Sequence, residues 1–246
     1  MSENMNGMSA GNTADKTYAN TKYKDTFFRY LFKEKSGMLE LYNALFDDCL
    51  TDESEIEDCT IEDVFTRQMK NDLAFRVRKK RVIVLTEHQS TLNENMPLRF
   101  LMYLGRTYNQ MMTTNAVYKE RRIELDAPEF VVFYNGDEEQ PERKEILLSK
   151  AFSANTGETN MELVVLQINI NKGQNEELKA ACKTLQEYAE FTERAREHRK
   201  EMELEDAIRT TIDECIRDGI LKDFLLKNKA EVYHMCLYEF DVELHE

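Results

Sequence analysis

Residues 69–88 constrain the fold of this chain more than any other segment. The runs MKNDLAFRV (69–77) and RVIVLTEH (81–88) are rich in Val, Ile, Leu and Phe, and a short basic stretch separates them. Runs of this kind predict β-strands, and a connection this short predicts that the two strands pair as an antiparallel hairpin. The chain must therefore build a sheet, whose apolar faces other elements have to cover.

The register of this hairpin follows if Lys79-Lys80 form a two-residue turn. One face is then nearly all apolar, with the opposed pairs Val77 and Val82, Phe75 and Val84, and Leu73 and Thr86. The other face pairs Arg76 with Ile83, Ala74 with Leu85, and Asp72 with Glu87. Opposed Cβ atoms lie about 4.5–5.5 Å apart. Gln89 points to the same face as Glu87 and lies opposite Lys70.

Two opposed carboxylates repel each other unless something compensates their charge. A divalent cation provides that compensation, and Mg²⁺ prefers carboxylate, carbonyl and water oxygens. Such a metal can activate water and stabilise charge on a phosphoryl oxygen. The turn lacks the Asn-Gly or Asp-Gly pair typical of two-residue hairpins, and a longer turn would shift the register. Two exposed acids on an ordinary hairpin remain the alternative interpretation of Asp72 and Glu87.

The remaining segments predict a mixed sheet with helices packed on it, in the α/β or α+β class. Residues 24–46 have helical spacing and are divided near Gly37, and residues 47–58 form an acidic loop. Short strands are expected at 61–65, 130–134 and 163–170. A helix begins at Asn95-Met96-Pro97, and a charged helical pattern extends from about 175 to 229. Within the acidic C-terminal region, residues 193–209 (ERAREHRKEMELEDAIR) predict one amphipathic helix, and a shorter one follows at 218–240 (DGILKDFLLKNKAEVYHMCLYEF).

Three segments together resemble the recombination-promoting nuclease/putative transposase family of the PD-(D/E)XK nuclease superfamily. They are KDTFFRYLF (24–32), EHQSTLNENMPLRFLMYLGRTY (87–108) and PEFVVFYNG (128–136), in the family's order, and the resemblance covers about residues 22 to 170. It implies a restriction-endonuclease-like αβββαβ core, a divalent metal (Mg²⁺ or Mn²⁺) and hydrolysis of DNA phosphodiesters, in recombination or on mobile-element DNA. It also maps the metal-binding acids onto Asp72 and Glu87 and the third catalytic position onto Gln89.

The glutamine departs from the commoner superfamily pattern, which has a lysine at this position. A neutral amide orients water by hydrogen bonds but cannot lower its pKa by charge. We therefore expect either that the metal carries more of the water activation or that Lys70 supplies the charge. Asp25 is the best candidate for a further catalytic acid and Glu40 the second, although an acid at position 25 is equally expected from the helix macrodipole.

The expected DNA-binding surface lies within residues 66–122, which contain 12 basic and 4 acidic residues in a chain whose net charge is −14. The hairpin tip RVRKKR contributes Arg76, Arg78, Lys79, Lys80 and Arg81, although such a run also suits a solvated turn that deters edge pairing. On the helix from Pro97, a polar stripe suited to phosphate contacts is expected at Arg99, Tyr103, Arg106 and Gln110. The apolar stripe of that helix is expected at Leu98, Leu101, Met102, Gly105, Tyr108, Met111 and Met112.

Composition suggests where such a protein operates. Five cysteines without a C-x-x-C pair fit reduced thiols in a cytoplasmic protein, and the sequence contains no apolar run long enough for a membrane span. We expect a disordered leader at 1–20, a nuclease-like domain at 21–172 and an acidic helical region at 173–246. His88 should point away from the acids and have a structural role.

Two alternatives to the nuclease remain open. The first is a catalytically silent DNA-binding or assembly protein on a nuclease fold. The second is a protein-interaction module built on the acidic C-terminal helices, through which the chain forms a homo-oligomer.

Overall fold

The computed structural model describes residues 23–60, 73–113, 115–153 and 159–237 of the chain. A six-stranded mixed sheet in the order β1-β2-β3-β4-β6-β5 forms its centre. The strands are β1 (Ile56–Asp58), β2 (Leu73–Val77), β3 (Val82–Gln89), β4 (Ala127–Tyr134), β5 (Arg143–Leu147) and β6 (Val164–Asn169). The strands β3, β4 and β6 run parallel, whereas the pairs β1–β2, β2–β3 and β5–β6 are antiparallel. The predicted α/β class is therefore confirmed.

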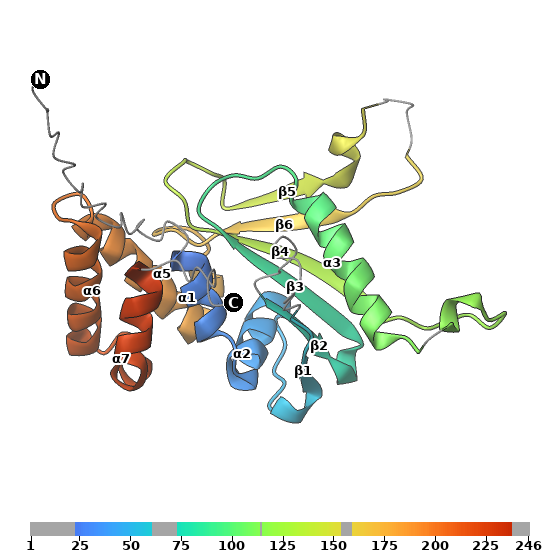
Figure 1. The fold of residues 1–246 in the computed structure, drawn as a ribbon, viewed down its shortest axis with the longest axis horizontal. Coiled ribbons are helices and arrows are strands. Elements are labelled where there is room, and N and C mark those ends of the chain that lie inside the picture. The colour runs from blue at the N-terminus through green and yellow to red at the C-terminus, as the bar shows by residue number, and fades with distance from the viewer. Residues whose placement is uncertain (1–22, 61–72, 114, 154–158, 238–246) are drawn as a thin grey trace, which may run out of the picture.

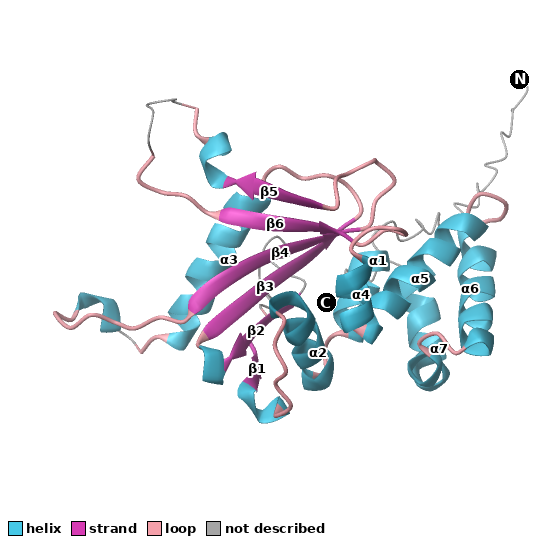
Figure 2. Cartoon of the chain, turned by 180° about the vertical axis from the view of Figure 1, so that it is seen from behind, coloured by secondary structure: helices cyan, strands magenta, loops and turns pink. Residues whose placement is uncertain are grey.

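Helices cover the two faces of the sheet unequally (Figure 1). Helix α3 (Met96–Met111) connects β3 to β4 and packs on one face. The other face carries α1 (Tyr23–Leu31), α2 (Lys35–Phe46), α4 (Glu176–Ala181) and α5 (Lys183–His198), and α6 (Leu204–Asp218) and α7 (Lys222–Leu237) pack beyond them (Figure 2). The predicted start of α3 at Met96-Pro97 agrees with these bounds. Residues 24–46 form two helices as predicted, but the break between them is at 32–34, and Gly37 lies in the first turn of α2.

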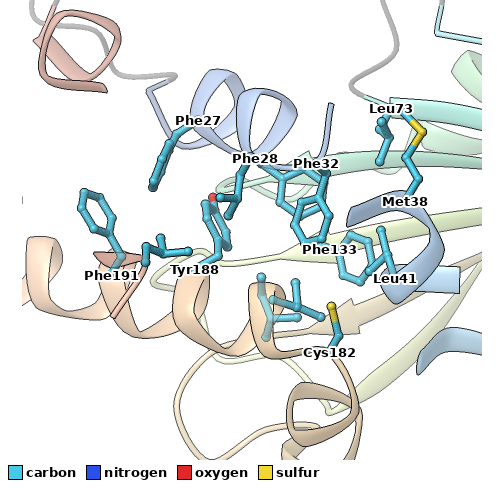
Figure 3. Close-up of a cluster of buried hydrophobic side chains, with 14 of the residues drawn as sticks. Phe27, Phe28, Phe32, Met38, Leu41, Leu73, Phe133, Cys182, Tyr188 and Phe191 are labelled. Atoms are coloured by element: carbon cyan, nitrogen blue, oxygen red, sulfur yellow. The ribbon is translucent and has the colours of Figure 1, made fainter. Parts of the chain in front are cut away.

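The core on the crowded face is dominated by aromatic side chains from distant parts of the chain (Figure 3). Phe28 of α1 lies with its ring centroid 5.4 Å from that of Phe133 on β4 and 5.4 Å from that of Tyr188 on α5. Fully burying such a side chain stabilises the fold by about 1.5–3 kcal/mol. Leu178, Phe191, Ile208 and Ile212 belong to the same cluster, so the C-terminal helices share one core with the sheet and with α1 and α2.

Two strands occur where the sequence did not predict them. β1 lies inside the expected acidic loop, and β5 at Arg143–Leu147 was not expected at all. Both strands are short, charged and at an edge of the sheet, where only one neighbour is needed and apolar alternation is weak. The strand predicted at 61–65 lies outside the described residues.

The single helix predicted through residues 193–209 is also wrong, because α5 ends at His198 and α6 begins at Leu204. No glycine or proline marks this break. The two helices instead fold back on each other and are joined by ion pairs of Arg194 with Asp218 and of His198 with Glu214. This return buries Ile208, Ile212 and Cys215 against the core, which a single straight helix would not do.

Candidate active site

The β2–β3 hairpin has the register that the sequence predicted. Leu73 pairs with Thr86, Ala74 with Leu85, Phe75 with Val84, Arg76 with Ile83 and Val77 with Val82. The turn itself differs: it is a 3₁₀ turn at Arg78–Lys80, closed by the Arg81 N–H donating to the Arg78 carbonyl at 3.1 Å, with Arg81 at φ 55°. A left-handed residue after the turn preserves the register without an Asn-Gly pair. Asp72 and Lys70, the expected partners of Glu87 and Gln89, lie outside the described residues.

Glu87 is a buried carboxylate, 2% exposed, on the face of the sheet that α3 covers. Arg99 Nη2 of α3 donates to Glu87 Oε2 at 3.0 Å. The same guanidinium donates to the Tyr103 hydroxyl from Nη2 at 3.0 Å and from Nε at 3.2 Å. Burial, with the nearby negative charge of Glu87, raises the pKa of Tyr103 to about 12, so its hydroxyl stays protonated near neutral pH. Since the Arg99 side chain is 35% exposed, it links this buried carboxylate to solvent.

Gln89 ends β3 and points to the same face as Glu87 by strand alternation. It is partly buried and pairs in register with Tyr134 of β4, and its carbonyl accepts from the Asn135 N–H at 2.9 Å. The carboxyl ends of the parallel strands are where open α/β sheets bind their ligands. Glu87 and Gln89 therefore lie at the end of the sheet where a site is expected.

His88 points to the opposite face, as the sequence predicted. Its Nδ1 lies 2.8 Å from Asp25 Oδ1 of α1, and its Nε2 lies 3.0 Å from the Tyr188 hydroxyl of α5. Burial lowers the pKa of His88, against the opposing effect of Asp25. Asp25 thus contacts a buried imidazole on the opposite face of the sheet from Glu87. The structure does not place Asp25 at the expected catalytic position. Glu40 also lies elsewhere, with its Oε2 accepting from Thr184 Oγ1 at 2.5 Å.

The basic hairpin tip is largely neutralised by acids from other segments. Arg76 and Arg81 both pair with Asp126, Arg81 also pairs with Glu124 at 2.8 Å, and Arg78 pairs with Glu57 at 3.1 Å. Lys80 pairs with Asp48 at 2.6 Å, and the Lys79 backbone N–H donates to Glu55. Val82 and Glu87 are five residues apart on β3, so the tip lies about 17 Å from the carboxylate along the strand. The structure therefore does not bring these cations together with Glu87.

Helix α3 is rotated relative to the sequence prediction. Its buried residues are Met96, Pro97, Phe100, Tyr103 and Thr107, whereas Leu98 and Met102 of the expected apolar stripe are 45% and 46% exposed. Apolar residues occupy more than half of the helix circumference, so periodicity alone does not select the buried side. Tyr103, expected among the DNA contacts, is only 2% exposed and is a core residue that supports Arg99. Arg106 is partly buried and Gln110 is exposed.

The expected metal ion would need a group of acidic, histidine or cysteine side chains close enough to bind it together. Within residues 23–60, 73–113, 115–153 and 159–237, no group of three or more His, Cys, Asp or Glu side chains could hold a metal ion. Of the two predicted ligands, Glu87 is described, and its carboxylate is the donor type that Mg²⁺ prefers. The ion pair with Arg99 means that a cation bound by Glu87 would share this carboxylate with a guanidinium.

Comparison of the chain with protein-family models, with curated proteins and with solved structures finds no match. Across the described part of the chain, no helix is both long and apolar enough to cross a lipid bilayer.

A further polar group, with no predicted role, lies at this end of the sheet. Lys24 of α1 and Arg196 of α5 both donate to Asn135, directly after β4. The only signal in the sequence was the pair Asn135-Gly136, which was expected simply to close a strand.

Proposed function

We propose that this protein is a divalent-metal-dependent DNA endonuclease with a restriction-endonuclease-like core. The observation that carries the proposal is a buried glutamate on a central strand whose register agrees with the predicted hairpin. Continuing that register by one pair beyond Leu73 and Thr86 would set position 72 against Glu87. The element order also suits the proposal, since α1 and α2 precede three antiparallel-paired strands, and α3 then connects β3 to the parallel strand β4.

In this proposal Asp72 and Glu87 hold Mg²⁺ or Mn²⁺, and Gln89 orients the attacking water by hydrogen bonding. The bound metal would supply an activated water and stabilise charge on the phosphoryl oxygens. Arg99 has the best placement for a phosphate, because it is partly exposed and already fixed beside Glu87 by Tyr103. A guanidinium grips phosphate oxygens bidentately, so Arg99 would position the DNA backbone at the acid, with Arg106 further along α3.

The test is cleavage of supercoiled plasmid with Mg²⁺, Mn²⁺ or EDTA. Glu87→Gln keeps an acceptor for Arg99 but removes the charge, so metal-dependent nicking should fall by at least about 100-fold. Asp72→Asn should have the same effect. Lys70→Met should reduce the rate only if this lysine supplies the charge that Gln89 lacks.

The matched control is Glu94→Gln. Glu94 follows β3, is 71% exposed and pairs with Lys144 at 3.0 Å, so its loss should leave nicking unchanged. Nicking that persists in EDTA, or full activity in a folded Glu87→Gln protein, would refute the proposal.

The pairing of the hairpin cations favours one alternative, a catalytically silent assembly protein on the same fold. Arg76, Arg78, Lys80 and Arg81 offer little uncompensated charge to a polyanion. That alternative predicts weak retention of a DNA duplex even at low salt, together with no nicking. Retention that weakens steeply as salt rises would instead support DNA binding.

A further inference from the structure

A polar cavity of about 670 Å³ opens at the carboxyl ends of β4 and β6. The loop from Gly136 to Gln140 forms one wall, and Asn171 and the end of α5 with Arg196 form another. This volume falls within the range of small-molecule sites, about 300–1,000 Å³. The end of α5 lines the cavity, whereas Glu87 faces α3.

Two cations meet on one amide beside this cavity. Lys24 Nζ donates to both the carbonyl and Oδ1 of Asn135 at 3.0 Å, and Arg196 Nη2 donates to the same two atoms at 3.2 and 3.0 Å. Arg196 Nη2 also reaches Asn171 Oδ1 at 3.1 Å. Because both donors meet Oδ1, the orientation of the Asn135 amide is fixed and its Nδ2 must point elsewhere.

Two buried donors at this point have no hydrogen-bond acceptor among the described residues. They are Asn135 Nδ2, in a side chain that is 1% exposed, and Arg196 Nε. Leaving a buried donor unsatisfied destabilises the folded state, and more so when the donor is charged. Two such donors on neighbouring side chains indicate a place for an acceptor from outside the chain.

Asp137 indicates which kind of acceptor fits. Its Oδ1 lies 2.9 Å from Arg196 Nε without hydrogen-bond geometry, and its side chain is 84% exposed. A carboxylate from a solvent-facing loop residue thus approaches the guanidinium from the open side. It occupies the region that an oxyanion from solution would take.

We propose that this cavity binds a small molecule through a single oxyanion group, a phosphate or a carboxylate. The group accepts from Asn135 Nδ2 and Arg196 Nε and displaces the Asp137 carboxylate. Lys24 completes the positive side of the site from α1. The assignment is independent of any nuclease activity, since none of these residues touches Glu87 or Gln89 through its side chain.

The rim of the cavity carries charges of both signs. Asp137, Glu138, Glu139 and Glu197 line it and are all exposed, and the exposed Lys172, Arg199 and Lys200 line it as well. Glu193 holds Arg196 Nη1 at 2.7 Å. A compact ligand with one anionic end reaches Arg196 with less repulsion from the acids than a long polyanion would.

Lys24 gives the site a pH dependence. Burial, and next the positive charge of Arg196, lower the pKa of Lys24 to about 8, while Asp137, Asp25 and Glu193 oppose this shift. An added oxyanion favours the charged lysine and would raise its pKa. Binding should therefore be strongest below pH 8 and weaken as the lysine deprotonates above it.

The proposal is tested by titrating the full-length protein with inorganic phosphate and, separately, with acetate at constant ionic strength. The heat of binding and the shift of the thermal unfolding temperature are measured. Asp137→Ala removes the competing carboxylate and should tighten binding about two- to fivefold. Asn135→Asp keeps the oxygen that accepts from Lys24 and Arg196 but replaces the Nδ2 donor by a negatively charged oxygen. Binding of the oxyanion should therefore weaken at least about tenfold. Glu138→Ala, on the same loop, is the matched control and should change the affinity less than Asp137→Ala does.

Opposite effects of Asp137→Ala and Asn135→Asp on the affinity would support the proposed oxyanion site. Should Asn135→Asp not fold, Arg196→Lys replaces it, because it keeps the charge but lacks Nε and should lose binding. Absence of binding by both probes, equal affinities in all variants, or preferential binding of a short DNA duplex sensitive to Asn135→Asp would each overturn the proposal.

Discussion

At the scale of single residues, Asp126 shows how the basic hairpin is held. Its carboxylate is 3% exposed and accepts from both Arg76 and Arg81, while its carbonyl accepts from the Tyr108 hydroxyl at 2.6 Å. Burial works to raise the pKa of Asp126, but the hydrogen bonds from the two arginines outweigh it and the pKa is lowered. A group with a lowered folded-state pKa stabilises the protein above its unfolded pKa near 4, and this contribution is lost as the pH falls.

Replacing Asp126 by Asn should therefore destabilise the protein at pH 7 by roughly 1–3 kcal/mol. The difference from wild type should shrink toward pH 3, because below about pH 4 the unfolded chain takes up a proton at this aspartate and the advantage of the ionised native carboxylate declines. Urea unfolding at both pH values measures this. Asp58→Asn is a suitable control, since Asp58 is an exposed acid at the end of β1. An equal loss at both pH values would contradict the electrostatic explanation.

His88 predicts a second loss of stability on acidification, in a higher pH range than that of Asp126. Its pKa is lowered by burial, so below about pH 6.5 the unfolded chain binds a proton that the native imidazole does not. Stability must then fall as the pH falls below 6.5. His88→Gln should lower stability at pH 7.5 but flatten its decline between pH 6.5 and 5, as measured by urea unfolding across that range. An unchanged slope would show that another group causes the decline.

At the scale of elements, two glycines should respond oppositely to alanine. A Cβ at Gly105 of α3 would meet nothing within 4 Å, whereas a Cβ at Gly136 would lie 2.2 Å from the Ser90 carbonyl oxygen. Gly105→Ala should stabilise the protein by about 0.5–1 kcal/mol because alanine favours the helix. Gly136→Ala should destabilise it, since backbone would have to move. Thermal unfolding of the two variants side by side measures this, and equal shifts would contradict the close approach at Gly136.

The elements also show what a single sequence can and cannot predict. The register of β2 and β3 was predictable from a short turn around Lys79-Lys80, which sets Phe75 opposite Val84. The buried side of α3 was not predictable, because Leu98 and Phe100 are equally apolar and only the sheet surface decides between them. β1 and β5 were not predicted, because their sequences are rich in charged residues and so resemble those of loops.

The candidate site was predictable in part for the same reason. Strand alternation separated Glu87 and Gln89 from His88 correctly, because it is a local property. The partners were not predictable: Asp126 and Glu57 neutralise the hairpin from far along the chain, and Arg196 reaches Asn135 across 61 positions. Local charge counts therefore overestimated the positive surface, and no local pattern pointed to the cavity beside Asn135.

At the scale of the whole molecule, the C-terminal helices are part of the structural core. Tyr188 reaches both His88 on β3 and the Lys24 carbonyl on α1, and Phe191 lies 4.8 Å from Phe27 between ring centroids. A chain ending at residue 172 would expose the cluster that these side chains complete. It should lose its cooperative urea transition and its near-ultraviolet circular dichroism, the two measurements that check this. A truncated chain that unfolds cooperatively like wild type would contradict the shared core.

The alternation of β3 has a consequence for how this chain tolerates change. Positions 87 and 88 are consecutive, yet one side chain contacts α3 and the next contacts α1 and α5. Inserting a single residue between Val82 and Glu87 would exchange the environments of the carboxylate and the imidazole, sending each to a layer with the wrong partners. Lengthening or shortening the chain should therefore be tolerated between α5 and α6 far better than anywhere along this strand.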